Sequence, residues 1–131
     1  MPIFVDTNVV VYALGQDAAK FERAESILGN QPTISVQVIN EFLSVCRVKL
    51  GLDIATRHRL ANELLAGCNV VALDARVIEK AMEIERQNGV SFWDALIVAA
   101  AILSGCETLY SEDLQHLRVF DGLLTVVNPF I

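Results

Sequence analysis

The sequence is poor in cysteine and proline, and it has no long apolar run. Its three cysteines, Cys46, Cys68 and Cys106, form no C-x-x-C or C-x-x-H pair, which argues against a zinc site or a disulfide scaffold. We interpret them as small buried residues. The longest apolar run, residues 95–103, is much shorter than the ~20 residues that a membrane span needs. No basic segment precedes an apolar stretch at the N-terminus, so we expect no signal peptide and a cytoplasmic protein.

Basic residues are also scarce. The 131 residues contain 10 Lys and Arg against 16 Asp and Glu, a net charge of −6. That sign is unfavourable for a protein that binds nucleic acid through a broad basic surface. One segment, residues 47–59, departs from this average, with the basic side chains Arg47, Lys49, Arg57 and Arg59. It is either an ordinary solvated helical face or the place where a polyanion docks.

Apolar residues make up 53% of the chain, enough for one compact domain spanning residues 1–131. Short β-branched runs alternate with longer helical patterns. Strands are predicted at 2–5, 69–73, 108–110 and 124–127, with a brief extended piece at 32–34. Helices are predicted to begin at the caps Asp17, Ser35, Asp53, Asp74 and Ser91 and to end near Gly29, Leu50, Gly67, Gly89 and Gly105. This alternation predicts an α/β fold in which helices cover both faces of a parallel sheet.

Three carboxylates lie where such a fold places a reactive crevice, beyond the carboxyl ends of the strands. Asp6 directly follows the first strand, and Asp113 comes shortly after the strand at 108–110. Asp94 lies in the first turn of the helix that Ser91 begins. We therefore expect the three side chains to lie near one another.

A fourth acid, Glu41, lies in the middle of a helical pattern. It shares one face with three valines, Val38, Val45 and Val48. A buried carboxylate is costly unless it is paired or bound to a metal, so this position is unusual. The alternative is that Glu41 extends past the valines to water.

The other acids also have purely structural interpretations. Asp6 can cap a helix that follows it, Ser91 and Asp94 fit a capping box, and Asp113 can cap a helix over 114–120. Four carboxylates in one crevice would repel each other unless a divalent cation neutralised them. Ligands that are all oxygen favour Mg²⁺ or Mn²⁺ over zinc, and His58 and His116 have no metal-ligand spacing.

Five segments together resemble the PIN-domain ribonucleases, and within them the VapC-like toxins of toxin–antitoxin pairs. They occur in the family's order at residues 3–8, 38–42, 92–97, 109–114 and 126–130. The resemblance implies a three-layer α/β/α sandwich with a central parallel sheet. It also implies an endoribonuclease that depends on Mg²⁺ or Mn²⁺ and cuts structured RNA.

In that resemblance, the catalytic and metal-binding quartet corresponds to Asp6, Glu41, Asp94 and Asp113. Thr7, Asn8 and Ser111 correspond to the family's polar helper residues. Glu112 can share or replace the role of Asp113, because the two carboxylates are adjacent.

The resemblance further implies a small antitoxin whose C-terminal segment lies over the active-site groove and places a basic residue among the carboxylates. A homodimer is also expected, with apolar residues available for its interface at Phe21, Ile27, Leu28, Leu60 and Leu64. Two alternatives are a PIN-fold nuclease outside a toxin–antitoxin pair and a non-catalytic PIN-fold binding module. A haloacid-dehalogenase-like phosphatase would need D-x-D where this chain has Asp6-Thr7-Asn8. A response-regulator receiver would need an acidic pair and a lysine that are not evident.

Overall fold

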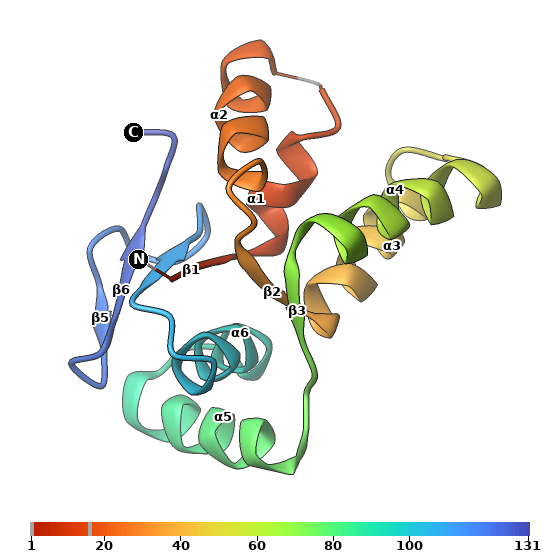
Figure 1. Ribbon diagram of the computed structural model, residues 1–131. Helices are drawn as coiled ribbons and strands as arrows, with labels where there is room; N and C mark the ends of the chain where they lie inside the picture. Colours follow the sequence, from red (N-terminus) through yellow and green to blue (C-terminus); the bar gives the residue numbers. More distant parts are fainter. Residues whose placement is uncertain (1, 16) are drawn as a thin grey trace.

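The structure is a computed structural model that describes residues 2–15 and 17–131. Six short strands form one sheet in the order β3-β2-β1-β4-β6-β5 (Figure 1). They are β1 (Ile3–Val5), β2 (Thr33–Ser35), β3 (Asn69–Val71), β4 (Thr108–Tyr110), β5 (Val119–Phe120) and β6 (Leu124–Val127). Neighbouring strands run parallel except at one edge, where β5 pairs antiparallel with β6. The predicted α/β fold is confirmed, and the predicted parallel pairing holds for every pair of neighbouring strands except β5 and β6.

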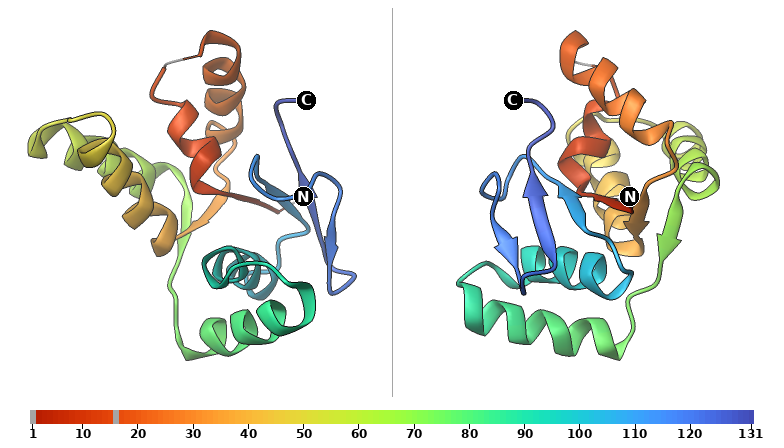
Figure 2. Two further views of the ribbon diagram at one scale, coloured as in Figure 1. Left: turned by 180° about the vertical axis from the view of Figure 1, so that it is seen from behind. Right: turned by 60° about the vertical axis from the view of Figure 1, so that its left-hand side comes forward.

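The helices form two layers, with α5 and α6 on one side of the sheet and α1 to α4 on the other (Figures 1 and 2). They are α1 (Thr7–Tyr12), α2 (Ala18–Leu28), α3 (Val36–Val48), α4 (Ile54–Gly67), α5 (Ala75–Asn88) and α6 (Phe92–Leu103). Residues 95–101 of α6 are all buried, because α6 packs between the sheet and α5. Among the described residues, no helix is both long and apolar enough to cross a membrane.

The predicted helix starts agree with the structure. The carboxylates of Asp17, Asp53 and Asp74 each accept a backbone N–H in the first turn of the helix that follows. Ser35 is at the predicted N-cap position of α3, but its buried hydroxyl makes no capping hydrogen bond. The start of α3 therefore depends more on packing of its apolar face than on its cap.

The structure contains a helix, α1, for which the sequence analysis offered only the cap Asp6, and it lacks another helix that was considered. The short helix α1 contains three successive valines, Val9 to Val11, which favour a strand by propensity. The proposed helix over 114–120 is wrong, because this segment turns and returns to the sheet edge as β5. Leu117 has a φ of 68°, and its N–H donates to the Val126 carbonyl at 2.8 Å. Pairing with β6 thus satisfies backbone groups that a helix would have satisfied internally.

The strand order explains where a site can form. From β1 the chain builds the sheet outward through β2 and β3, whereas β4, β6 and β5 extend it in the opposite direction. The reversal lies between β1 and β4, which pair in parallel from Ile3 to Val5. Just beyond these strands, the Asp6 N–H donates to the Tyr110 carbonyl at 2.9 Å. Such a reversal leaves a crevice at the carboxyl ends of the strands.

Candidate active site

Asp6 lies at this crevice as the N-cap of α1. Its Oδ1 accepts the Thr7 N–H at 2.7 Å, and its Oδ2 accepts the Ser111 hydroxyl at 2.8 Å. Asn8 Nδ2 approaches the same Oδ2 at 3.5 Å. Burial raises the pKa of Asp6 to about 6, and the charges of Glu41 and Asp113 add to the rise although the hydrogen bonds oppose it. The capping interpretation is confirmed, and it is compatible with a role in the site.

Glu41 comes from α3 and forms a hydrogen bond with Thr7, the residue that follows Asp6. Its Oε1 accepts the Thr7 hydroxyl at 2.5 Å, and its Oε2 accepts Gln37 Nε2 at 3.4 Å. The same Gln37 nitrogen donates to the Trp93 carbonyl at 3.2 Å, which joins the starts of α3 and α6. Glu41 is therefore held by polar neighbours on the cavity wall. The valine face is not uniform, because Val38 is buried and Val48 is exposed.

Asp94 lies in the first turn of α6, the third helix that contributes a carboxylate to the site. Its N–H donates to Ser91 Oγ at 3.1 Å, which confirms Ser91 as the N-cap. Burial raises the pKa of Asp94, and the charges of Asp113 and Glu41 contribute to the rise. The pKa shifts of Asp6 and Asp94 share Glu41 and Asp113 as perturbing charges, so these carboxylates act on one another electrostatically.

The turn after β4 separates the two adjacent carboxylates. Asp113 lines the same cavity as Asp6, and its N–H donates to Ser111 Oγ at 3.3 Å. Glu112 instead accepts hydrogen bonds from Lys20 Nζ at 2.7 Å and from the Tyr12 hydroxyl at 2.6 Å. These contacts lower the pKa of Glu112. Of the two adjacent acids, Asp113 therefore lines the cavity, whereas the Glu112 side chain pairs with Lys20 and Tyr12.

One cavity of about 540 Å³ collects the four predicted acids. Its other lining residues are Thr7, Asn8, Val11, Tyr12, Gln37, Ser44, Val45, Lys49, Trp93 and Ile97. Its carboxylate donors, with no histidine or cysteine in the lining, suit a hard divalent cation such as Mg²⁺ or Mn²⁺. Within residues 2–15 and 17–131, no three His, Cys, Asp or Glu side chains are already close enough together to hold a metal ion.

The basic segment contributes little to this cavity. Lys49, at the end of α3, lines it, whereas Arg57 donates to the Leu52 carbonyl at 2.9 Å. Arg59 forms an exposed ion pair with Glu63 at 3.1 Å, and Arg47 is exposed on α3. The structure thus brings one of the four predicted RNA-contacting residues to the cavity wall.

Trp93 is a candidate that the sequence analysis did not select. It lines the cavity beside Asp94, yet the residue is 66% exposed. Its ring lies edge-on to Phe92, with centroids 5.9 Å apart. An exposed tryptophan next to four carboxylates is unusual, and its position directly before Asp94 was the available signal.

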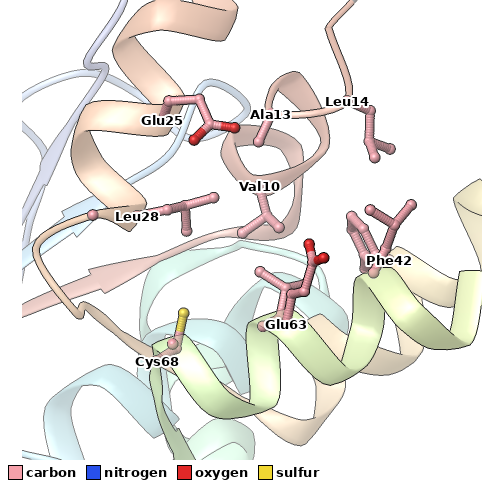
Figure 3. Close-up of a pocket in the computed structure, with 12 residues that line it drawn as sticks. Val10, Ala13, Leu14, Glu25, Leu28, Phe42, Glu63 and Cys68 are labelled. Carbon is pink, nitrogen blue, oxygen red and sulfur yellow. The ribbon is translucent and has the colours of Figure 1, made fainter.

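A second cavity, of about 260 Å³, lies between α1, α2 and α4 (Figure 3). Its lining includes the apolar side chains of Val10, Leu28 and, from α3, Phe42, and Glu25 of α2 lies across from Glu63 of α4. Three residues of the expected dimer interface, Leu28, Leu60 and Leu64, line this cavity. Ile27 of that set is buried in the core, and Phe21 is exposed. The apolar residues of α2 and α4 are therefore divided between the core, this second cavity and the surface.

Comparison with known proteins identifies the family. A PIN domain is matched over residues 3–121. The chain belongs to the PIN-domain family. No curated protein sequence gives a significant match.

Solved structures from toxin–antitoxin systems share the fold. A chain of a toxin–antitoxin complex from Klebsiella pneumoniae superposes with a TM-score of 0.71 at 21% identity, covering 98% of both chains. A chain of VapBC2 from Rickettsia felis, solved with a promoter DNA fragment, gives 0.70 at 20% identity over 98% of this chain and 100% of its own. The sarcin–ricin loop cleaving toxin VapC20 from Mycobacterium tuberculosis gives 0.64 at 24% identity over 85% of this chain and 89% of its own. The fold predicted from the resemblance is confirmed.

Proposed function

We propose that this PIN-domain protein is a Mg²⁺- or Mn²⁺-dependent endoribonuclease and the toxin of a toxin–antitoxin pair. The observation that carries the proposal is the single cavity lined by Asp6, Glu41, Asp94 and Asp113. The raised pKa values of Asp6 and Asp94 support it, because carboxylates that are costly to ionise together favour a bound cation.

Asp6 and Asp94 would hold the cation most directly, and Glu41 and Asp113 would complete the site. When bound, a divalent cation neutralises the phosphodiester, activates water and stabilises the leaving oxygen. A carboxylate on the cavity wall accepts the proton of the attacking water. Thr7 and Ser111 hold Glu41 and Asp6 by hydrogen bonds.

The RNA strand would enter past Lys49 and Trp93. Lys49 offers a phosphate contact on the wall formed by α3, and Trp93 offers an exposed ring on which a base can stack. Stacking needs an unpaired base, so single-stranded loops of structured RNA are the favoured substrate. VapC20, a structural relative, is itself a sarcin–ricin loop cleaving toxin.

The test is cleavage of a sarcin–ricin loop hairpin and of total RNA by the purified protein with Mn²⁺, Mg²⁺ or EDTA. We expect cleavage to require metal and to be lost in Asp6→Asn and in Asp94→Asn. Asp74→Asn is the matched control, since it removes a charge remote from the cavity and keeps an N-cap for α5. Cleavage that survives in Asp94→Asn would contradict the assignment of this residue.

Besides the C-terminal segment expected over the active-site cavity, an antitoxin would place an apolar segment that carries basic side chains in the second cavity, between α1, α2 and α4. The pairing of apolar lining with Glu25 and Glu63 supports this location. Solved structures of similar fold come from toxin–antitoxin complexes, which supports the existence of such a partner. The gene adjacent to this one should encode that partner. Co-purification of its product with the wild type, and its loss with Glu25→Lys/Glu63→Lys, would test the site. A PIN-fold nuclease outside such a pair would have no such neighbour.

A further inference from the structure

Lys20 joins four parts of the chain beside the candidate site. From the first turn of α2, its Nζ lies 2.7 Å from Glu112 Oε2 and 3.0 Å from the Tyr12 hydroxyl. The same ammonium group lies 4.5 Å from the centroid of the Tyr12 ring and 5.3 Å from that of Phe130. The two rings pack edge-on, with centroids 4.9 Å apart. We call Lys20, Tyr12, Glu112 and Phe130 the lysine cluster.

The lysine cluster is connected to Asp6 through the backbone of Glu112. The Glu112 N–H donates to Asn8 Oδ1 at 3.1 Å, and Asn8 Nδ2 lies 3.5 Å from Asp6 Oδ2. The neighbours of Glu112 in the chain belong to the site. The Ser111 hydroxyl donates to Asp6, and Asp113 lines the cavity. The orientation of the Glu112 side chain is therefore coupled to the turn that supplies Ser111 and Asp113.

We propose that Lys20 is a positioning residue that withholds Glu112 from the cavity and so presents Asp113 as the fourth carboxylate. This inference rests on the proposed function. Lys20 and Glu112 keep only 31% and 28% of their side-chain surface exposed, so each would be a poorly compensated charge without the other. Hydrogen bonds from Lys20 and Tyr12 hold the Glu112 carboxylate, which does not line the cavity.

Without the ammonium group, Glu112 loses its counter-ion and the turn loses its anchor to α2. The Glu112 carboxylate then turns toward the cavity and adds a fifth negative charge to it. That charge strengthens cation binding and repels the RNA phosphate, so metal affinity and turnover change in opposite directions. A residue that only stabilised the fold would not produce this opposite effect.

The experiment compares Lys20→Met with the wild type in two assays. Met keeps an apolar stem against Tyr12 and Phe130 and removes the charge. In Mn²⁺ titrations without RNA, followed by electron paramagnetic resonance, we expect at least threefold tighter binding. In cleavage assays we expect kcat to fall at least tenfold. Adding Glu112→Gln to Lys20→Met should return both values to near those of the wild type, because Gln still accepts from Tyr12 but carries no charge.

Lys80→Met is the matched control, since Lys80 also bridges to a distant carboxylate, Asp121, and lies outside the cavity lining. It should leave Mn²⁺ binding and kcat unchanged. Thermal unfolding of each variant separates loss of fold from loss of positioning. If Lys20→Met leaves Mn²⁺ affinity unchanged, or if Glu112→Gln fails to restore it, the inference is overturned. If the wild type binds Mn²⁺ but cleaves no RNA, the proposed function fails while the Mn²⁺ titrations still decide the role of Lys20.

Discussion

Two requirements on Asp6 conflict at neutral pH: its burial favours the neutral carboxyl, whereas cation binding needs the charged carboxylate. It is 6% exposed, and burial raises its pKa to about 6 from 3.8. Because the folded-state pKa lies above the unfolded value, the neutral carboxyl stabilises the fold fully below pH 3.8, and this contribution is lost as the pH rises through 6. The site therefore carries a stability cost at the pH where its charge is needed.

This cost predicts a pH-dependent effect of Asp6→Asn. Between pH 4 and pH 7 in EDTA, the unfolding free energy of the variant should rise relative to that of the wild type by up to about 3 kcal/mol. Urea unfolding at several pH values measures the difference. Adding Mn²⁺ at pH 7 should stabilise the wild type and leave the variant almost unaffected. If the difference in unfolding free energy between Asp6→Asn and the wild type does not change with pH, ionisation of Asp6 does not destabilise the folded protein.

Trp93 gives a second prediction at this scale. Trp93→Ala should raise KM for a hairpin RNA by about 5- to 100-fold with a much smaller change in kcat, since base stacking is lost. Trp93→Phe should recover most of the affinity. Leu123→Ala, which also removes an exposed apolar side chain but lies outside the cavity lining, is the control. An unchanged KM would contradict base stacking on Trp93, and a change in the oligomeric state of Trp93→Ala would instead indicate a contact with another protein chain.

At the scale of the elements, two glycines at helix ends should respond oppositely to alanine. Gly89 follows α5 with a φ of 68°, whereas Gly67 ends α4 without a positive φ, and neither has an atom within 4 Å of an added Cβ. Gly89→Ala should therefore destabilise the protein by about 1 kcal/mol through backbone strain alone. Gly67→Ala should stabilise it by up to about 1 kcal/mol. Chemical denaturation of both variants tests this, and equal effects would contradict it.

The sequence predicts most elements because caps and apolar periodicity are local signals. Asp17, Asp53 and Asp74 cap the predicted helices, and the strand-end rule brings Asp6 and Asp113 to one cavity. For α1 the local signals disagree, because Asp6 can cap a helix whereas Val9 and Val10 favour a strand, and tertiary burial of the two valines overrides that strand propensity.

Contacts between distant segments are the part of the site that the sequence does not reveal. The Thr7–Glu41 hydrogen bond and the Lys20–Glu112 ion pair join residues 34 and 92 positions apart. No local pattern marks either pair, and both depend on how α1 and α2 pack in the folded protein. The sequence alone therefore does not reveal that Asp113, and not Glu112, lines the cavity.

At the scale of the whole molecule, the net charge of −6 limits how RNA can be held. One of the four cations of the basic segment lines the cavity, and Arg57 and Arg59 have partners within the protein. RNA binding should therefore depend only weakly on salt. For the inactive Asp94→Asn variant at fixed Mg²⁺, a plot of log K against log[KCl] should have a slope of about −1, as for one or two phosphate contacts. A slope near about −3 would mean that all four cations bind phosphate.

The pairing of β1 with β4 and of β4 with β6 has a consequence for synthesis on the ribosome. Asp6 emerges early, but its hydroxyl partner on Ser111 lies 105 positions later, and β4 is flanked by β6 only after residue 127 has been made. The ribosomal exit tunnel still shelters that last strand when translation reaches it. The crevice of a nascent chain is therefore incomplete. The site can assemble only after nearly all of residues 1–127 have left the ribosome.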